Sequence, residues 1–138
     1  FMGLVGSEMC IRDSGYTYSG HPLACAAGLA TLEVYREEDL FARAAELAPY
    51  FQEAVHSLAD CKNVIDVRNL GLMGAIELES IAGKPTARAM EAFQKAFERG
   101  LLVRTTGDTI ALSPPLIVER KHIDFIAETV RDVIETVH

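Results

Sequence analysis

The spacing of apolar residues changes along the chain, and the first part has the period of a helix. From residue 22 to residue 58, apolar positions recur every three or four residues. The run SGHP (19–22) is a typical helix start, with Ser19 or Gly20 as the capping residue and Pro22 in the first turn. Alanine and glycine dominate the helix that follows, so another element can approach its backbone closely.

A second helix is predicted to begin near residues 37–39, where the acidic side chains suit the positive end of a helix dipole. Its apolar positions form a single stripe of six residues: Leu40, Ala44, Leu47, Phe51, Val55 and Leu58. Pro49 interrupts this stripe without ending it. A proline inside a helix removes one hydrogen bond, so we expect a kink or a break into two pieces there.

The period then changes to two, which indicates strands. Ile65 and Val67 are expected on one face of the first strand, and Ile76 and Leu78 on one face of the second. Gly71 and Gly74 bracket the turn between them, which completes a hairpin. We interpret Met73 as a core residue.

The last third of the chain repeats the alternation of helix and strand. A helix with four apolar residues on one side (Ala89, Met90, Phe93 and Phe97) ends at Gly100. Two short strands, LLVR (101–104) and TIAL (109–112), precede a final helix from about Glu119. The order ααββαββα predicts an α+β fold with a small, mostly antiparallel four-stranded sheet covered on one face by helices.

Composition narrows the classes of function. The chain has 138 residues, the size of one domain, and a net charge of −7, which argues against a nucleic-acid partner. No apolar run reaches the roughly 20 residues of a membrane span. The three cysteines are scattered and the histidines show no ligand spacing, so we expect neither a disulfide framework nor a metal site. A reducing, cytoplasmic location is the default expectation.

The run GYTYSGHPLACAAG (15–28) resembles a stretch of the class III pyridoxal-phosphate aminotransferases, close to the ω-amino acid–pyruvate (β-alanine–pyruvate) branch. The resemblance runs from about Gly15 to Val137 and corresponds to the C-terminal part of such an enzyme. It implies that residues 15–138 are the small C-terminal domain with its leading linker helix. Residues 1–14 match nothing that the family places there, and we interpret them as artefactual or as a poorly ordered terminus without function.

Two residues are candidates for binding. From the residues alone, Thr17 is a cap or turn residue and Arg104 a solvated arginine at the end of a strand. The resemblance implies more: the threonine at the position of Thr17 contacts the cofactor phosphate of the neighbouring subunit. The arginine in RGLLVRTTGDTIALSPPL, Arg104, matches the one that binds the substrate carboxylate. We interpret His21, Pro22 and Asp108 as structural, with Asp108 shaping a turn.

The resemblance also bears on activity. The chain has four lysines (Lys62, Lys84, Lys95 and Lys121), and none stands where the family places the lysine that carries pyridoxal 5'-phosphate, which is upstream of GYTYSGHP. The intact parent, a homodimer or tetramer, would move an amino group from an ω-amino acid such as β-alanine, or from an amine, to pyruvate or a similar keto acid. The chain alone is expected to be inactive.

One alternative stays open, a stand-alone small α+β module that binds a ligand or a partner. A fragment would expose an apolar side on its alanine-rich helix, because that side has lost its neighbour.

Overall fold

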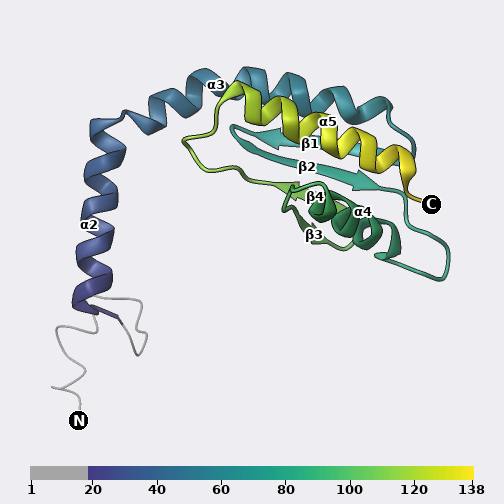
Figure 1. Cartoon of the computed structure of the whole chain (residues 1–138), viewed down its shortest axis with the longest axis horizontal. Helices are drawn as coiled ribbons and strands as arrows, with labels where there is room; N and C mark the ends of the chain where they lie inside the picture. Colours follow the sequence, from purple (N-terminus) through teal and green to yellow (C-terminus); the bar gives the residue numbers. More distant parts are fainter. Residues whose placement is uncertain (1–18) are drawn as a thin grey trace, which may run out of the picture. The chain divides into compact units, whose positions relative to one another are not determined.

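The computed structural model describes residues 19–138, which belong to two compact units, the first ending at Glu38 and the second beginning at Asp39 in the sequence (Figure 1). In the first unit, the described part is essentially the helix α2 (Pro22–Glu37). Its capping residue is His21 and not Ser19 or Gly20, because the His21 Nδ1 accepts a hydrogen bond from the Ala24 N–H at 3.4 Å. None of the residues of α2 is buried.

The second unit has the predicted order of elements. Helix α3 (Leu40–His56) leads through a short 3-10 helix, η1 (Ser57–Asp60), into the hairpin of β1 (Val64–Leu70) and β2 (Met73–Leu78). Helix α4 (Ala87–Glu98), the hairpin of β3 (Arg104–Thr106) and β4 (Thr109–Leu112), and helix α5 (Arg120–Thr136) follow. Helix α3 continues through Pro49, so the chain does not break into two pieces there.

The four strands form one sheet in the order β1-β2-β4-β3, and every neighbouring pair is antiparallel. Helices α3, α4 and α5 pack on one face, which we call the inner face (Figure 1). Its buried strand residues, Ile76, Leu78, Ile110 and Leu112, join helix residues such as Phe51 and Ile134 in one core cluster. The predicted α+β fold with helices on one face is therefore confirmed.

The first strand does not keep the predicted alternation. Val64 pairs with Leu78 and Asp66 with Glu77, so the register shifts between them and Ile65 becomes the extra residue of a bulge. Because a bulge reverses the faces on either side of it, Val67 faces the core while Ile65 is 61% exposed. The prediction that Ile65 and Val67 share a face is wrong for this reason.

Gly74 and Met73 also differ from the prediction. Gly74 lies within β2 and not in the turn. A Cβ atom added at this position would come within 3.2 Å of the Phe51 ring and 3.3 Å of Val55. Its role is therefore to let α3 approach the sheet closely. Met73 is on the opposite face and 57% exposed, so it is not a core residue.

Helix α4 packs through small residues. Ala89, Ala92 and Ala96 are buried, whereas two of the predicted core residues, Met90 and Phe97, are 50% and 63% exposed. The alanine stripe brings the helix close to the sheet, which leaves the larger side chains at the margin. Arg88 is buried in the same helix because its guanidinium donates to the backbone carbonyls of Glu79 and His138, the latter at 2.8 Å.

Candidate functional site

The strands place Arg104 on the outer face of the sheet, opposite to the helices. The sequence predicts that Arg104 ends a strand formed by residues 101–104. In the structure, Arg104 instead begins β3, because residues 101–103 are not part of the ladder. It pairs with Ala111, which pairs with Ala75, which pairs with Arg68. Directly paired residues point to the same face. The outer face therefore carries a row across all four strands, with an arginine at each end and two alanines between them.

The two arginines of this row differ in their partners. Arg68 forms ion pairs with Asp66 and with Glu77, the latter at 2.8 Å. The hydrogen bond to Glu77, followed by that to Asp66, raises the pKa of Arg68, which stays charged. Within residues 19–138, Arg104 makes neither a hydrogen bond nor an ion pair. Its planar fork of N–H donors is available for a carboxylate, which such a fork binds through two parallel hydrogen bonds.

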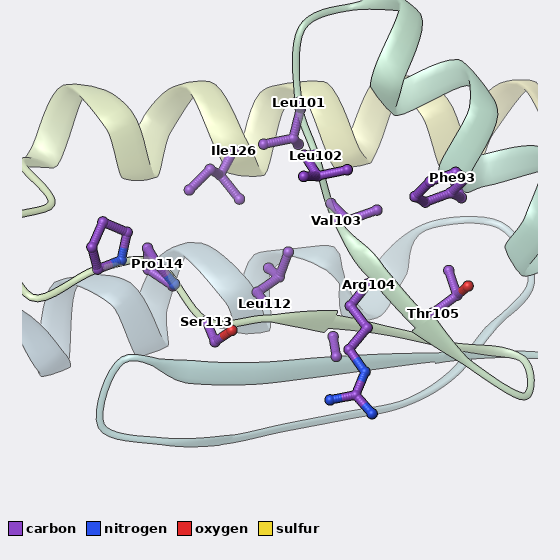
Figure 2. A pocket seen from close by; sticks show the side chains of 12 residues that line it. Phe93, Leu101, Leu102, Val103, Arg104, Thr105, Leu112, Ser113, Pro114 and Ile126 are labelled. Atoms are coloured by element: carbon purple, nitrogen blue, oxygen red, sulfur yellow. The ribbon is translucent and has the colours of Figure 1, made fainter. Parts of the chain in front are cut away.

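Arg104 borders a cavity of about 580 Å³ at the end of β4. Apolar side chains dominate its walls, among them Phe93, Leu101 and Ile126, and the hydroxyl groups of Thr105 and Ser113 add polar points. Figure 2 shows the side chain of Arg104 extending away from these apolar residues. The guanidinium is thus at the rim of the cavity, toward the outer face.

A second, smaller hollow of about 270 Å³ lies at the other end of the row, beside Arg68, Leu70 and Met73. There the arginine is already neutralised by Asp66 and Glu77. Of the two arginines on the outer face, Arg104 is therefore the one that an approaching anion can bind.

Asp108 shapes more than the turn that the sequence predicted. The turn itself is formed by Gly107, at φ +59°, and Asp108, between the paired Thr106 and Thr109. The Asp108 Oδ2 also accepts hydrogen bonds from the Ser80 hydroxyl and from the Thr86 N–H, the latter at 3.1 Å. The Ser80 hydrogen bond, supported by that from Thr86, lowers the pKa of Asp108. Sequence reasoning missed these partners, since nothing in their spacing links residues 22 and 28 positions apart.

The remaining candidates are not brought to this site. Thr17 lies outside the described residues. Lys95 donates to the Thr136 carbonyl at 2.7 Å and pairs with Glu91, Lys121 pairs with Glu119, and none of the four lysines lines the cavity beside Arg104. The part of the chain that the structure describes also has no cluster of His, Cys, Asp or Glu suited to a metal ion. None of its helices has the length and apolar character to cross a bilayer.

Comparison with known families and proteins gives a consistent set of matches. Residues 4–134 match the family model described as aminotransferase class-III, and this range begins inside the segment 1–14. An omega-aminotransferase of Caulobacter vibrioides is 68% identical over 87% of this chain and 27% of its own length. A beta-alanine–pyruvate aminotransferase of Pseudomonas aeruginosa is 42% identical over 97% of this chain and 30% of its own length.

A solved structure matches as well. The omega transaminase of Pseudomonas jessenii, in complex with PMP, superposes with a TM-score of 0.80 at 29% identity. The match covers 88% of this chain and 28% of that protein. The chain thus spans less than a third of the length of each of these three proteins.

Proposed function

Because this chain belongs to the class III aminotransferases, we propose that it is the C-terminal part of a pyridoxal-phosphate-dependent, cytoplasmic ω-amino acid–pyruvate aminotransferase. The enzyme moves an amino group from an ω-amino acid such as β-alanine, or from an amine, to pyruvate or a similar keto acid. In this enzyme, Arg104 binds the substrate carboxylate. Thr17, which lies outside the described residues, contacts the cofactor phosphate of a neighbouring subunit.

One observation supports the role of Arg104 above the others: it is a cation on a strand, beside a largely apolar cavity, without a partner in residues 19–138. Most arginines of this part of the chain have a structural role. Arg43 donates to the carbonyls of Leu116 and Val118 at 3.1 and 2.9 Å, and Arg88 is buried against two carbonyls. Arg104 has no such role, which leaves it free to bind a ligand.

The cavity suits the substrates of this proposal. A keto acid or amino acid has a carboxylate at one end and a carbon chain next to it. The guanidinium at the rim would hold the carboxylate through a charge-assisted, two-pronged contact. Ala111, which pairs with Arg104 on the same face and also borders the cavity, would contact the carbon chain next to the carboxylate.

The residues described here do not supply the cofactor's own site. Pyridoxal phosphate, when bound, serves as the electron sink of the reaction and needs a lysine at its aldehyde carbon. No lysine of residues 19–138 lines the cavity, and two of the four are held by acidic partners, Lys95 by Glu91 and Lys121 by Glu119. We therefore propose that the chain alone does not catalyse amino transfer and that the upstream part of the enzyme holds the cofactor.

Helix α2 supports the view that the chain is part of a larger assembly. It buries none of its residues, and Leu23, Leu29 and Leu32 are 74%, 65% and 61% exposed. Apolar side chains in such numbers on one short helix are typical of a surface that another part of a protein covers. In the intact enzyme, which we propose to be a homodimer or tetramer, the upstream part or a second subunit would do so.

The experiment joins residues 19–138 to the upstream part of the Caulobacter omega-aminotransferase and measures amino transfer from β-alanine to pyruvate. We expect an active chimera whose KM for β-alanine rises by about 10- to 100-fold on Arg104→Ala, which corresponds to the loss of hydrogen bonds to a charged group. With an aryl-alkyl amine as donor, which has no carboxylate, the KM for the donor should change little.

The matched control is Arg99→Ala, which removes an exposed arginine that pairs with Asp132 at 3.2 Å, away from the cavity. An unchanged KM for β-alanine in Arg104→Ala would contradict the carboxylate role. An equal loss with both donors would also contradict it, because that result would indicate damage to the fold.

A further inference from the structure

The position of Arg104 depends on a short hairpin at the edge of the sheet. Strand β3 has three residues and pairs only with β4. Arg104 is at its first position, next to residues 101–103, which are outside the ladder. Three paired positions on one side are a weak support for a side chain that must hold a ligand in place. The hairpin therefore needs a second attachment.

Asp108, at the tip of this hairpin, provides the attachment through two kinds of contact. Its backbone carbonyl accepts a hydrogen bond from the Leu78 N–H at 2.9 Å, at the end of β2. Its carboxylate accepts hydrogen bonds from the Ser80 hydroxyl and from the Thr86 N–H. Ser80 and Thr86 belong to the connection between β2 and α4, so the tip is fastened to a different part of the chain.

Helix α4, which begins directly after Thr86, has no side-chain cap of its own. Thr86 is the N-cap residue of α4, but its side chain makes no capping hydrogen bond. Its φ of +68° is in the left-handed region, which is unfavourable for a β-branched residue. The Asp108 carboxylate satisfies the Thr86 N–H in place of a local cap, and its negative charge suits the positive end of the helix.

The contact closes a ring in the chain. From Thr86 the chain runs through α4 into β3 with Arg104, and Asp108 then returns to Thr86, 22 positions earlier. Helix α4 also packs against both β3 and β4. A segment whose two ends are joined in this way has less conformational freedom than a hairpin with a free tip.

We propose that Asp108 is a positioning residue for Arg104: by fastening the hairpin to the N-terminus of α4, it holds the guanidinium where it meets the substrate carboxylate. This inference rests on the proposed function of Arg104. Asp108 itself does not touch the substrate, so its loss changes substrate binding only through Arg104.

The first test uses the 138-residue chain and amide hydrogen exchange measured by NMR. We expect Asp108→Ala to speed exchange of the Thr86 amide and of the β3–β4 amides by about tenfold or more, because the ring opens locally. In Asp108→Asn, which keeps an acceptor oxygen, these amides should exchange at rates between those of the unsubstituted chain and those of Asp108→Ala. The control is Asp60→Ala, which removes an exposed aspartate that pairs with Arg131 on another side of the unit. Unchanged exchange in Asp108→Ala would overturn the proposal.

The second test uses the chimera described above. We expect Asp108→Ala to raise the KM for β-alanine by about tenfold with less effect on kcat, and to leave the KM for an aryl-alkyl amine nearly unchanged. Added to Arg104→Ala, the same substitution should change the KM for β-alanine by less than about twofold, because residues that act through one contact are not additive.

The outcomes separate the two proposals. If Arg104→Ala raises the KM for β-alanine and Asp108→Ala does not, the carboxylate role stands and the positioning role is overturned. If Arg104→Ala itself has no effect, the carboxylate role fails and the positioning role fails with it. A full additional effect of Asp108→Ala in the Arg104→Ala background would show that Asp108 acts on the fold in general, which also overturns the proposal.

Discussion

The two faces of the four-stranded sheet carry different kinds of side chain. On the inner face, Ile76 and Ile110 are 0% and 1% exposed beneath the helices. On the outer face, the alanines at the same level, Ala75 and Ala111, are followed by arginines at both edges. The inner face holds the fold together, whereas the outer face has little buried apolar surface to lose. Its residues can therefore serve binding at a small cost in stability.

The largest difference between the faces should appear on deletion of an apolar side chain. Phe51 is 0% exposed at the centre of the core cluster, and Phe51→Ala should lower the free energy of unfolding by about 3–5 kcal/mol. Leu70, on the outer face, is 75% exposed, and Leu70→Ala should change it by less than about 0.5 kcal/mol. Urea unfolding followed by circular dichroism measures both. Similar losses for the two variants would remove the distinction between the faces.

A smaller effect is expected from adding a methyl group to the inner face. The Cβ of Gly74→Ala would meet Phe51 at 3.2 Å and Val55 at 3.3 Å. We expect a loss of about 1–3 kcal/mol from overpacking, because α3 must move away from the sheet or the side chains must leave their rotamers. The same unfolding experiment in the Val55→Ala background should show a smaller penalty for Gly74→Ala, since the contacts with the two Val55 methyl groups are then gone and only that with Phe51 remains. An unchanged penalty there would exclude the steric explanation.

A third prediction concerns the loss of folding stability at low pH. Hydrogen bonds from Lys95, Ser80 and Lys121 lower the pKa values of Glu91, Asp108 and Glu119, respectively. A carboxyl group whose pKa is lower in the folded state contributes stability above its unfolded pKa and loses that contribution as the pH falls through its folded pKa. The urea midpoint of unfolding should therefore decline from about pH 5 downward, where unfolded carboxyl groups begin to bind protons.

Asp108→Asn provides the control for this decline. The variant should be less stable at neutral pH and should lose less on acidification, because one of the titrating groups is gone. A midpoint that falls equally in both proteins would assign the acid sensitivity to other carboxyl groups. Glu91 and Glu119, whose pKa values are also lowered, would then be the next to replace.

The order of elements could be predicted from the sequence because it depends on local periods. The six-residue stripe of α3 and the alternation at Ile76 and Leu78 each reflect one buried face, and a local pattern is enough to detect that. The predicted α+β fold followed from this order. The same logic failed at Ile65, where a bulge inserts one residue and reverses the alternation, since a bulge depends on the partner strand.

The packing of α4 could not be predicted for a related reason. Its larger apolar residues, Met90 and Phe97, looked like a core face, yet its alanines are the residues that are buried. Arg88 is buried next to them only because carbonyls from Glu79 and His138 accept its hydrogen bonds. Such partners are distant in sequence, and no period reveals them.

The candidate site shows the same limit. The residue type of Arg104 and the resemblance of its segment to a family suggested that it binds a carboxylate ligand. They did not show that Arg104 pairs with Ala111 or that it has no ion-pair partner in residues 19–138. The link from Asp108 to Thr86 joins two elements that the sequence presents as separate. Contacts of this kind are a property of the folded chain, and they were therefore outside the reach of sequence reasoning.

The smallest expected effect on stability is that of Arg104→Ala. Because the guanidinium has no partner in residues 19–138, its removal should change the free energy of unfolding of the chain by less than about 0.5 kcal/mol. Arg88→Ala is the matched comparison, since it removes an arginine whose donors satisfy two carbonyls, and it should cost about 1–3 kcal/mol. Urea unfolding of the two variants side by side tests the difference. If Arg104→Ala is as costly as Arg88→Ala, the outer face contributes to the fold and Arg104 is not kept free for a ligand. If it costs nothing while raising the KM of the chimera for β-alanine, then stability and binding reside on opposite faces of one sheet.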